Sequence, residues 1–260
     1  MFNIVERNRE DYAHAESPLI PMALNVLTFQ REMHSGALVL DTRSPHQFAE
    51  GHIPGALDVS LHGSAFATRV GFIALPDSRL LLVINVGPDL SRPSLVVNVG
   101  ADLSRPAPMY RPEGDLHEAV RQLAVVGFDQ VVGYLDGGMP AWTEAELPVQ
   151  QLQQLTVEEL HTIHSDLAVL DVRDQNEWDE GHIKGALHIP YYFIEQHLQD
   201  EHDELNSYRD RPLAVTCASG QRSTIACSLL QRHNFRELFN VVGGMEAWEK
   251  AGFTKTLHSL

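Results

Sequence analysis

The feature that most constrains this chain is an internal duplication. Residues 40–43 (LDTR) and 48–57 (FAEGHIPGAL) recur as residues 170–173 (LDVR) and 178–187 (WDEGHIKGAL), and both blocks are displaced by the same 130 positions. Ordered repeats of this kind are the signature of a duplicated structural unit. The sequence therefore predicts two copies of one domain within its 260 residues.

The two copies differ in length. Residues 137–142 (GGMPAW) recur as residues 243–248 (GGMEAW), now displaced by 106 positions, so the first copy carries extra residues before this block. About half of the extra length is a direct repeat of 13 residues, in which 85–93 (NVGPDLSRP) returns as 98–106 (NVGADLSRP). We interpret this short repeat as an extended loop or an added strand, because surface insertions cost little stability.

Each copy has the pattern of an α/β domain. In the second copy, Thr156 followed by Glu159 predicts a capping box at the start of a helix. Short apolar segments predict strands, and a longer segment after Cys217 predicts a helix; the strands are expected at 167–172, 186–190, 212–216 and 239–242, and the helix at 222–231. Alternating elements of this length predict a parallel sheet flanked by helices on both faces.

The duplication also predicts the domain bounds. Residues 1–22 match nothing in the second copy and are expected to form an N-terminal extension. Residues 23–148 then form the first domain and residues 149–260 the second. The linker is expected within residues 147–155, where Gln-rich polar sequence follows a proline.

Composition excludes several classes of function. The formal net charge of −16 disfavours binding to nucleic acid or anionic lipid. The apolar stretches are strand-length and broken by charges, and the N-terminus lacks the regions of a secretory signal, so no membrane association is expected. The two cysteines, Cys217 and Cys227, make no disulfide framework, and we expect a cytoplasmic location.

The first copy is an internal control for the second, because it contains no cysteine. Residues that both copies keep cannot serve a cysteine in the first, and they are interpreted as scaffold. One set is Asp and Arg residues that are expected to form hydrogen-bonded pairs at strand ends: Asp41 with Arg43, and Asp171 with Arg173. The shared histidines, His52 and His182, and the Gly-Gly-Met-x-Ala-Trp blocks belong to the scaffold as well. His182 could act as a general base, but its match at His52 favours the structural role.

Only the second copy has the segment Cys217, Ala218, Ser219, Gly220, Gln221, Arg222 and Ser223. It lies between a predicted parallel strand and a helix start, where backbone amides and the helix dipole favour an anion. Gly220 lets the loop curl, and Arg222 adds positive charge. Such a site favours the thiolate, the nucleophilic form of Cys217. Cys227, inside the helix, is expected to be a packed core residue and not a resolving cysteine.

These residues resemble the rhodanese homology superfamily. The matching motifs are DVR at 171–173, EW at 177–178, GHIKGA at 181–186, Cys217 with Arg222, and the block at 243–248. The resemblance covers nearly the whole chain as two tandem modules. It implies a first module without activity and a second that carries the catalytic cysteine.

The resemblance also implies a reaction. Sulfurtransferases of the family have a six-residue loop, here residues 217–222, whereas the related phosphatases and arsenate reductases have one residue more. Cys217 would attack the outer sulfur of thiosulfate or a persulfide and then pass that sulfur to cyanide, a thiol or a sulfur-relay protein. The loop amides from Ala218 to Ser223 would stabilise the charge. Arg222 would orient the donor or brace the loop, and Ser223 is expected to cap the helix and to donate to the persulfide.

The first copy shows a narrower resemblance, carried by residues 66–72 (FATRVGF), 80–83 (LLLV), 118–123 (EAVRQL) and 132–138 (VGYLDGG). These segments resemble rhodanese modules attached to persulfide dioxygenases. The dioxygenase domain needs a metal cluster of the form His-x-His-x-Asp-His, which this sequence lacks. His161, His164 and Asp166 have a different spacing, so we expect neither a metal nor another cofactor. The resemblance suggests a place in sulfide and persulfide metabolism.

Two other classes of function stay open at this point. A rhodanese fold without chemistry serves as a binding or regulatory module, and the first copy has the sequence of one. A phosphatase is disfavoured by the short loop.

Overall fold

A computed structural model describes residues 21–86, 112–163 and 167–257. These residues fall into two compact units that divide between Pro148 and Val149, and residues 48–58 group with the second unit. We refer below to the elements before the division as the first repeat and to those after it as the second repeat. The direct repeat of 13 residues lies almost entirely outside the described residues.

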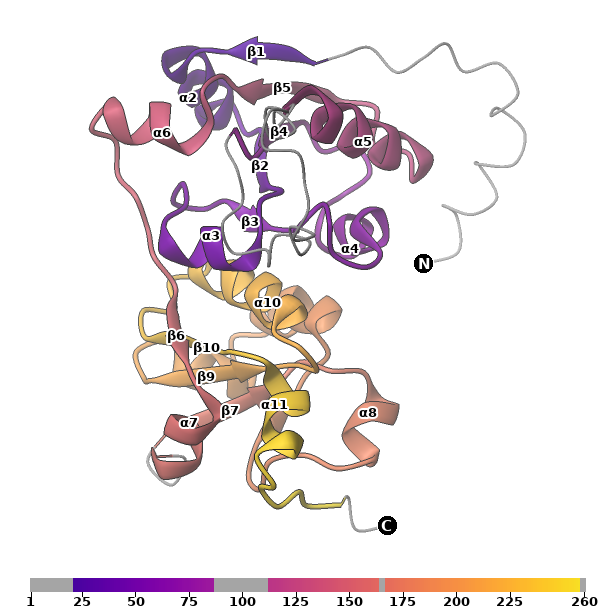
Figure 1. The fold of residues 1–260 in the computed structure, drawn as a ribbon, viewed down its shortest axis with the longest axis vertical. Helices are drawn as coiled ribbons and strands as arrows, with labels where there is room; N and C mark the ends of the chain where they lie inside the picture. The colour runs from indigo at the N-terminus through magenta and orange to yellow at the C-terminus, as the bar shows by residue number, and fades with distance from the viewer. Residues whose placement is uncertain (1–20, 87–111, 164–166, 258–260) are drawn as a thin grey trace, which may run out of the picture. The chain divides into compact units, whose positions relative to one another are not determined.

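The first repeat is built on a five-stranded sheet in the order β1-β5-β4-β2-β3 (Figure 1). Its strands are β1 (Met22–Leu24), β2 (Leu38–Asp41), β3 (Leu57–Asp58), β4 (Leu80–Val83) and β5 (Val131–Leu135). Its helices are α2 (Val26–His34), α3 (Pro45–Glu50), α4 (Phe66–Ile73), α5 (Pro112–Val125) and α6 (Gly138–Glu144).

The second repeat has a sheet of the same order, β6-β10-β9-β7-β8. Its strands are β6 (Gln153–Leu155), β7 (Ala168–Asp171), β8 (Leu187–His188), β9 (Leu213–Thr216) and β10 (Leu238–Val241). Its helices are α7 (Val157–Ile163), α8 (Gln175–Asp179), α9 (Ile194–Gln199), α10 (Gln221–Arg232) and α11 (Gly244–Lys250), with 3-10 turns at Tyr191–Phe193 and Glu204–Tyr208. Two parallel sheets with helices confirm the predicted fold class.

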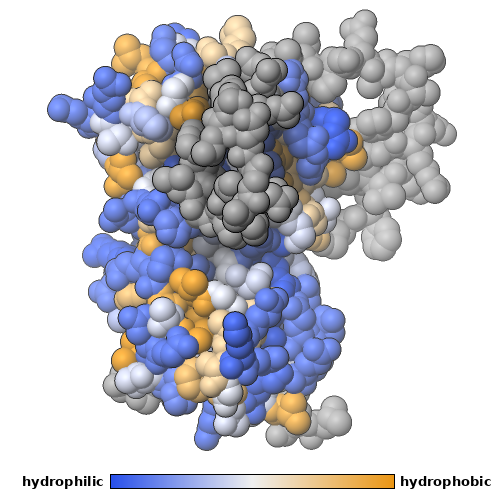
Figure 2. Space-filling view, in the orientation of Figure 1, coloured by the Kyte–Doolittle hydropathy of each residue, from blue (hydrophilic) through white to orange (hydrophobic). Residues whose placement is uncertain are grey.

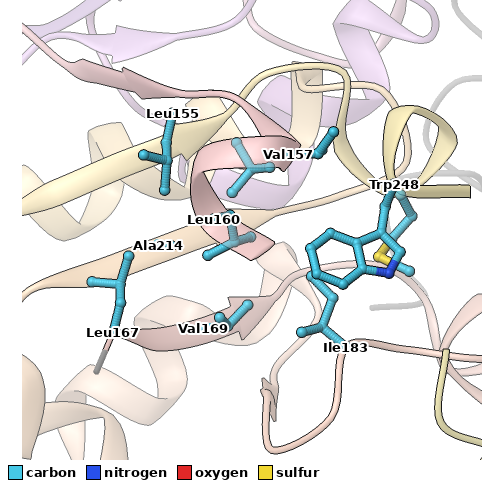
Figure 3. Close-up of a cluster of buried hydrophobic side chains, with 10 residues drawn as sticks. Leu155, Val157, Leu160, Leu167, Val169, Ile183, Ala214 and Trp248 are labelled. Atoms are coloured by element: carbon cyan, nitrogen blue, oxygen red, sulfur yellow. The ribbon is translucent and has the colours of Figure 1, made fainter. Parts of the chain in front are cut away.

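Helices cover both faces of the second sheet. In Figure 1, α10 lies on one side of β9 and β10, and α7 and α11 lie on the other. The core on the second side joins apolar residues of β6, α7, β7, β9, β10, α11 and two connecting segments (Figure 3): Leu155, Val157, Leu160, Leu167, Val169, Ile183, Ala214, Val241, Met245 and Trp248. This buried cluster fixes the strand ends from which the candidate site is built.

Of the predictions for the start of the second repeat, the capping box is confirmed and the extent of the linker is corrected. Thr156 and Glu159 form the predicted capping box: the amide of Glu159 donates to the Thr156 hydroxyl, and the amide of Thr156 donates to the Glu159 carboxylate. The linker expected at 147–155 is too long, because its last three residues form β6 beside β10. A three-residue edge strand of sequence QQL has no apolar alternation by which sequence could identify it.

The charged residues shared by the two copies form buried pairs. Asp171 accepts hydrogen bonds from the Arg173 guanidinium at 2.6, 2.9 and 3.0 Å, and Asp41 accepts hydrogen bonds from Arg43 at 2.6 and 2.8 Å. Arg173 also donates to the carbonyl of Gly181 at 2.9 Å. Each pair ties the end of a strand to the segment that follows, as a scaffold residue should.

The two shared histidines are scaffold as well. His182 stacks on Trp178 with ring centroids 3.5 Å apart, and its Nδ1 lies 3.1 Å from the Trp178 carbonyl. His52 repeats this arrangement on Phe48, with 3.7 Å between centroids and 2.8 Å to the carbonyl. The same geometry in a copy without cysteine argues against a general-base role for His182.

We predict that the buried pair supports the fold more than an exposed pair does. Asp171→Ala leaves the Arg173 guanidinium buried without its carboxylate, and we expect the free energy of unfolding to fall by about 3 kcal/mol in urea denaturation. The control is Arg236→Ala, which breaks a pair with Asp210 in which both side chains are 79% exposed. That variant should unfold like the wild type, and equal losses in the two variants would contradict the prediction.

Candidate functional site

Cys217 lies directly after β9, at the carboxyl end of the sheet, and α10 begins four residues later at Gln221. Cys217 is 1% exposed. The backbone N–H of Gly220 donates to its Sγ at 3.1 Å, and the hydroxyl of Ser223 lies 3.4 Å from the same sulfur. The chain therefore curls back around the thiol within one turn.

Gly220 makes that turn possible. It is the residue before α10, and its φ of +100° lies in the region that residues with a side chain rarely adopt. Gly220 therefore occupies the N-cap position, and the sequence prediction that Ser223 caps the helix is wrong. Ser223 instead lies inside the first turn of α10, fully buried.

The loop carbonyls are held by the start of α11. The amide of Met245 donates to the Cys217 carbonyl at 2.8 Å, and the amide of Glu246 donates to the Ala218 carbonyl at 3.0 Å. This close approach requires Gly244, because a Cβ there would collide with both carbonyl oxygens. The Gly-Gly block of the second copy thus places the start of α11 against the loop.

These contacts set the direction of the loop amides. In a trans peptide the C=O and the N–H point in opposite directions. Because the carbonyls of Cys217 and Ala218 face α11, the N–H groups of Ala218 and Ser219 face the other way. The Gly220 amide on the sulfur adds a third donor. Amides so arranged suit an anion at Cys217.

Arg222 is bound by two carboxylates. Its guanidinium donates to both oxygens of Glu177, at 2.5 and 2.7 Å, and to Asp174 at 3.1 Å. The hydrogen bonds from Arg222 hold the pKa of Glu177 below its usual range, and Glu177 in turn raises the pKa of Arg222. Of the two roles predicted for Arg222, this geometry favours bracing the loop over orienting the sulfur donor, because the two carboxylates already offset most of its positive charge.

Asp174 and Glu177 were not singled out as site residues by sequence reasoning. The signal was present in the duplication, since the constant offset of 130 places Ser44 and Gln47 at these two positions in the first copy. Both carboxylates therefore occur only in the copy that carries the cysteine. Tyr192 joins this group, and burial together with a hydrogen bond to Asp174 raises its pKa.

The remaining predicted residues divide between the loop and the core. Ser219 is exposed, and Ala218 and Gln221 are half-buried. Cys227 is fully buried in α10, and burial raises its pKa well above the usual range for a thiol. Both observations agree with the core role predicted for Cys227.

The first repeat has no equivalent nucleophile. In the sheet registers, Asp41 lies beside Val83 and Asp171 beside Thr216, so Ile84 takes the position of Cys217. The Ile84 side chain is 1% exposed. An apolar residue thus replaces the thiol in this copy.

Neither a metal site nor a membrane span is found where the structure can be described. Within residues 21–86, 112–163 and 167–257, no three His, Cys, Asp or Glu side chains are grouped so that they could hold a metal ion. Among the helices of these residues, none has the length and apolar character needed to cross a bilayer. Of the three residues that the sequence analysis considered and rejected as metal ligands, His164 and Asp166 lie outside the described residues.

Comparison with known proteins gives one family. The family model described as "Rhodanese-like domain" matches twice, at residues 25–145 and 156–251. YrkF of Bacillus subtilis (strain 168) is 34% identical over 84 residues, which are 32% of this chain and 41% of YrkF. The thiosulfate sulfurtransferase GlpE of Coxiella burnetii (strain RSA 331 / Henzerling II) is 29% identical over 84 residues, 32% of this chain and 73% of GlpE.

One solved structure spans both repeats. The thiosulfate sulfurtransferase of Pseudomonas aeruginosa covers 92% of this chain at 18% identity and a TM-score of 0.36, and the match covers 44% of that protein. This chain therefore spans less than half the length of that structure and of YrkF.

We predict that the Arg222–Glu177 pair stabilises the second repeat in a pH-dependent way. Because the pKa of Glu177 is lowered, its contribution is present at neutral pH and is lost as the pH falls through the lowered pKa. Glu177→Gln should reduce the free energy of unfolding by about 1 kcal/mol at neutral pH, and the difference from wild type should vanish in acid.

The matched control for this prediction is Glu249→Gln. It removes a carboxylate that binds Lys255 and is 51% exposed, so it should change little at any pH. A loss in Glu177→Gln that does not depend on pH would contradict the assignment.

Proposed function

The chain belongs to the rhodanese-like domain family, and from this premise we propose that it is a sulfurtransferase whose nucleophile is Cys217. The observation that carries the proposal is the loop itself. A buried thiol follows β9, a backbone amide donates to its sulfur, and two further amides of the loop face away from α11. In this proposal residues 23–148 are the domain without activity and residues 149–260 the catalytic domain.

The reaction is a double displacement. The thiolate of Cys217 attacks the outer sulfur of thiosulfate, the sulfur–sulfur bond breaks, and sulfite leaves with the bonding pair. A persulfide donor would react in the same way and release a thiol. The acceptor, cyanide or a thiol, then attacks the outer sulfur of the persulfide and restores the thiolate. The loop amides stabilise the negative charge on the outer sulfur.

The loop residues have distinct roles in this proposal. Gly220 and the amides of Ala218 and Ser219 line the persulfide, and Gln221 begins the helix whose dipole favours the charge. Arg222, bound by Glu177 and Asp174, holds the start of α10. The donor's anionic end is then left to the exposed rim, where Ser219 lies.

The alternative is a non-catalytic binding module in sulfide or persulfide metabolism. A specific observation favours this role for the first repeat alone, because Ile84 stands at the position of the nucleophile. We propose that the first repeat contributes no sulfur transfer.

The test is mass spectrometry of the thiosulfate-treated protein. Trypsin cleavage after Arg222 separates the two thiols, so each peptide reports on one cysteine. We expect the Cys217 peptide to gain the mass of one sulfur atom and to lose it on addition of cyanide, with release of thiocyanate.

Two variants control this experiment. Cys217→Ser should abolish thiocyanate release, because no other thiol has the loop amides. Cys227→Ala should keep it, because Cys227 is a core residue of α10. An unmodified Cys217 peptide with thiosulfate and with persulfide donors would overturn the proposal and favour the binding module.

A further inference from the structure

The helices of the second repeat begin in a row at the end of the sheet that carries Cys217. Its strands are parallel, and each is followed, directly or after a short segment, by a helix that starts at the carboxyl end of the sheet. Because the strand order is β6-β10-β9-β7-β8, the helix starts follow in the order α7, α11, α10, α8 and α9. The loop of Cys217 opens α10, in the middle of this row.

Carboxylates lie at the start of every helix around α10. The first turns of α7, α8, α9 and α11 and the N-cap of α8 supply six of them, which we call the acidic rim: Glu158, Glu159, Asp174, Glu177, Glu195 and Glu246. The first turn of α10 has no acidic residue and carries Arg222. In Figure 2 the surface over α8, which lies at the right of the second repeat in Figure 1, is hydrophilic, as expected for part of this rim.

The first repeat has the opposite arrangement. No acidic residue lies in the first turn of α2, α3, α4 or α6. The counterpart of α10 is α5, which joins β4 to β5 as α10 joins β9 to β10, and its fourth residue is Asp115. The helix dipole favours a carboxylate at a helix start in either repeat. The dipole alone therefore does not explain why carboxylates surround the loop only where the loop carries a cysteine.

Cations do not balance the rim. Of the nine Lys and Arg residues in the described part of the second repeat, residues 149–163 and 167–257, seven lie where helices end or where the chain leads into the next strand: Lys184, Arg209, Arg211, Arg232, Arg236, Lys250 and Lys255. The other two are Arg173, which forms a buried pair with Asp171, and Arg222, which Glu177 and Asp174 bind. The carboxyl end of this sheet therefore carries an excess of negative charge.

The loop and the rim act on different parts of a substrate. The loop amides act at contact distance, as the Gly220 amide does on Cys217 Sγ at 3.1 Å, and they suit the one negative charge of a reacting sulfur. The rim lies next to the loop, because the amide of Glu246 donates to the Ala218 carbonyl at 3.0 Å. Its charges act over about 10 Å at an ionic strength of about 0.1 M. Such a field raises the encounter rate of a cation and lowers that of an anion.

We propose that the acidic rim makes Cys217 select its sulfur donors and acceptors by charge: an organic thiol or persulfide that carries an ammonium group is preferred, and a dianion such as thiosulfate is disfavoured. The carboxylates form no binding site of their own, and they set the potential at the site already described. This inference deepens the proposed function and rests on it. Thiosulfate still loads Cys217 at high concentration, because the rim lowers its encounter rate and leaves the chemistry intact.

The potential at the loop is measured with a reporter thiol that needs no sulfur transfer. Ser219 is exposed, so Ser219→Cys in a Cys217→Ser protein places an accessible thiol on the loop, and the tryptic peptide that ends at Arg222 reports on it. The reporter thiolate attacks the sulfenyl sulfur of a methanethiosulfonate, a mixed disulfide forms, and methanesulfinate leaves. One reagent carries a trimethylammonium group and the other a sulfonate. The ionisation of the reporter is common to both and cancels in the ratio of their rates.

We expect the rim to favour the cationic reagent. The cation-to-anion ratio, divided by the same ratio for free 2-mercaptoethanol, should be about tenfold above one at an ionic strength of about 0.1 M. It should fall toward one as salt is added, because the rim charges are then screened. A normalised ratio of one or less at low salt would overturn the inference.

Two matched variants of the reporter protein assign the potential to the rim. Glu246→Gln removes an exposed carboxylate beside the loop, and Glu237→Gln removes an exposed carboxylate at the other end of β10. A strand of this length spans about 13 Å, which exceeds the screening length. We expect Glu246→Gln to lower the normalised ratio about twofold and Glu237→Gln to leave it unchanged. Equal effects of the two variants would contradict the assignment.

The consequence for sulfur transfer is measured on the wild-type chain loaded with persulfide at Cys217 and freed of donor. An acceptor thiolate attacks the outer sulfur, the sulfur–sulfur bond of the persulfide breaks, and Cys217 leaves as a thiolate. Three acceptors differ in charge: 2-aminoethanethiol, 2-mercaptoethanol and 2-mercaptoethanesulfonate. Each rate is taken per thiolate and relative to its own value at roughly 1 M salt, where the rim is screened. We expect a fall of about threefold for each unit of negative charge.

The outcomes separate this inference from the function on which it rests. A persulfide that forms and passes its sulfur equally well to all three acceptors would overturn the selection by charge and leave the sulfurtransferase standing. No persulfide at Cys217 with any donor would reject the sulfurtransferase, and the selection with it.

Discussion

In the second repeat, the loop that follows β9 directs peptide C=O groups toward α11 and peptide N–H groups the other way. The candidate site depends on this arrangement. The carbonyls of Cys217 and Ala218 are bound by the first amides of α11. Since a trans peptide cannot turn its N–H and C=O to the same side, the N–H groups of Ala218 and Ser219 face away from α11, and the N–H of Gly220 donates to the sulfur. Gly220 and Gly244 permit this because neither carries a side chain at a strained or crowded point. The anion site is thus a consequence of how α11 docks.

The duplication separates this scaffold from the chemistry. Both repeats keep the buried Asp–Arg pair, the stacked His and the Gly-Gly helix start, and both have the same strand order. Only the second repeat has the thiol and the two carboxylates on Arg222. Because the fold stands in the first repeat without any of these, they are best explained by what they do for Cys217.

The sequence predicts features that depend on residues close together along the chain. It does not predict contacts between distant residues that the sheet brings together. The capping box at Thr156 and the core position of Cys227 depend on spacing along the chain, and both are confirmed. The pairing of Asn240 with Gln154 depends on a strand register across 86 residues, which no spacing rule gives. The sequence predicts Ser223 as the cap because serine commonly caps helices, whereas Gly220 occupies that position in a left-handed conformation. Glu177 could be identified as a site residue from the sequence alone, because the duplication places Gln47 at the equivalent position of the first copy.

The charged side chains next to the active loop are paired with one another. Arg222 interacts electrostatically with Cys217, but Glu177 and Asp174 bind its guanidinium and offset most of its charge. Stabilisation of the anion then falls to the loop amides, whose dipoles are fixed before any donor arrives. In the proposed reaction these amides would stabilise the negative charge on the outer sulfur of the persulfide. Charge stabilisation would therefore come from the backbone of the loop and not from a free cation beside it.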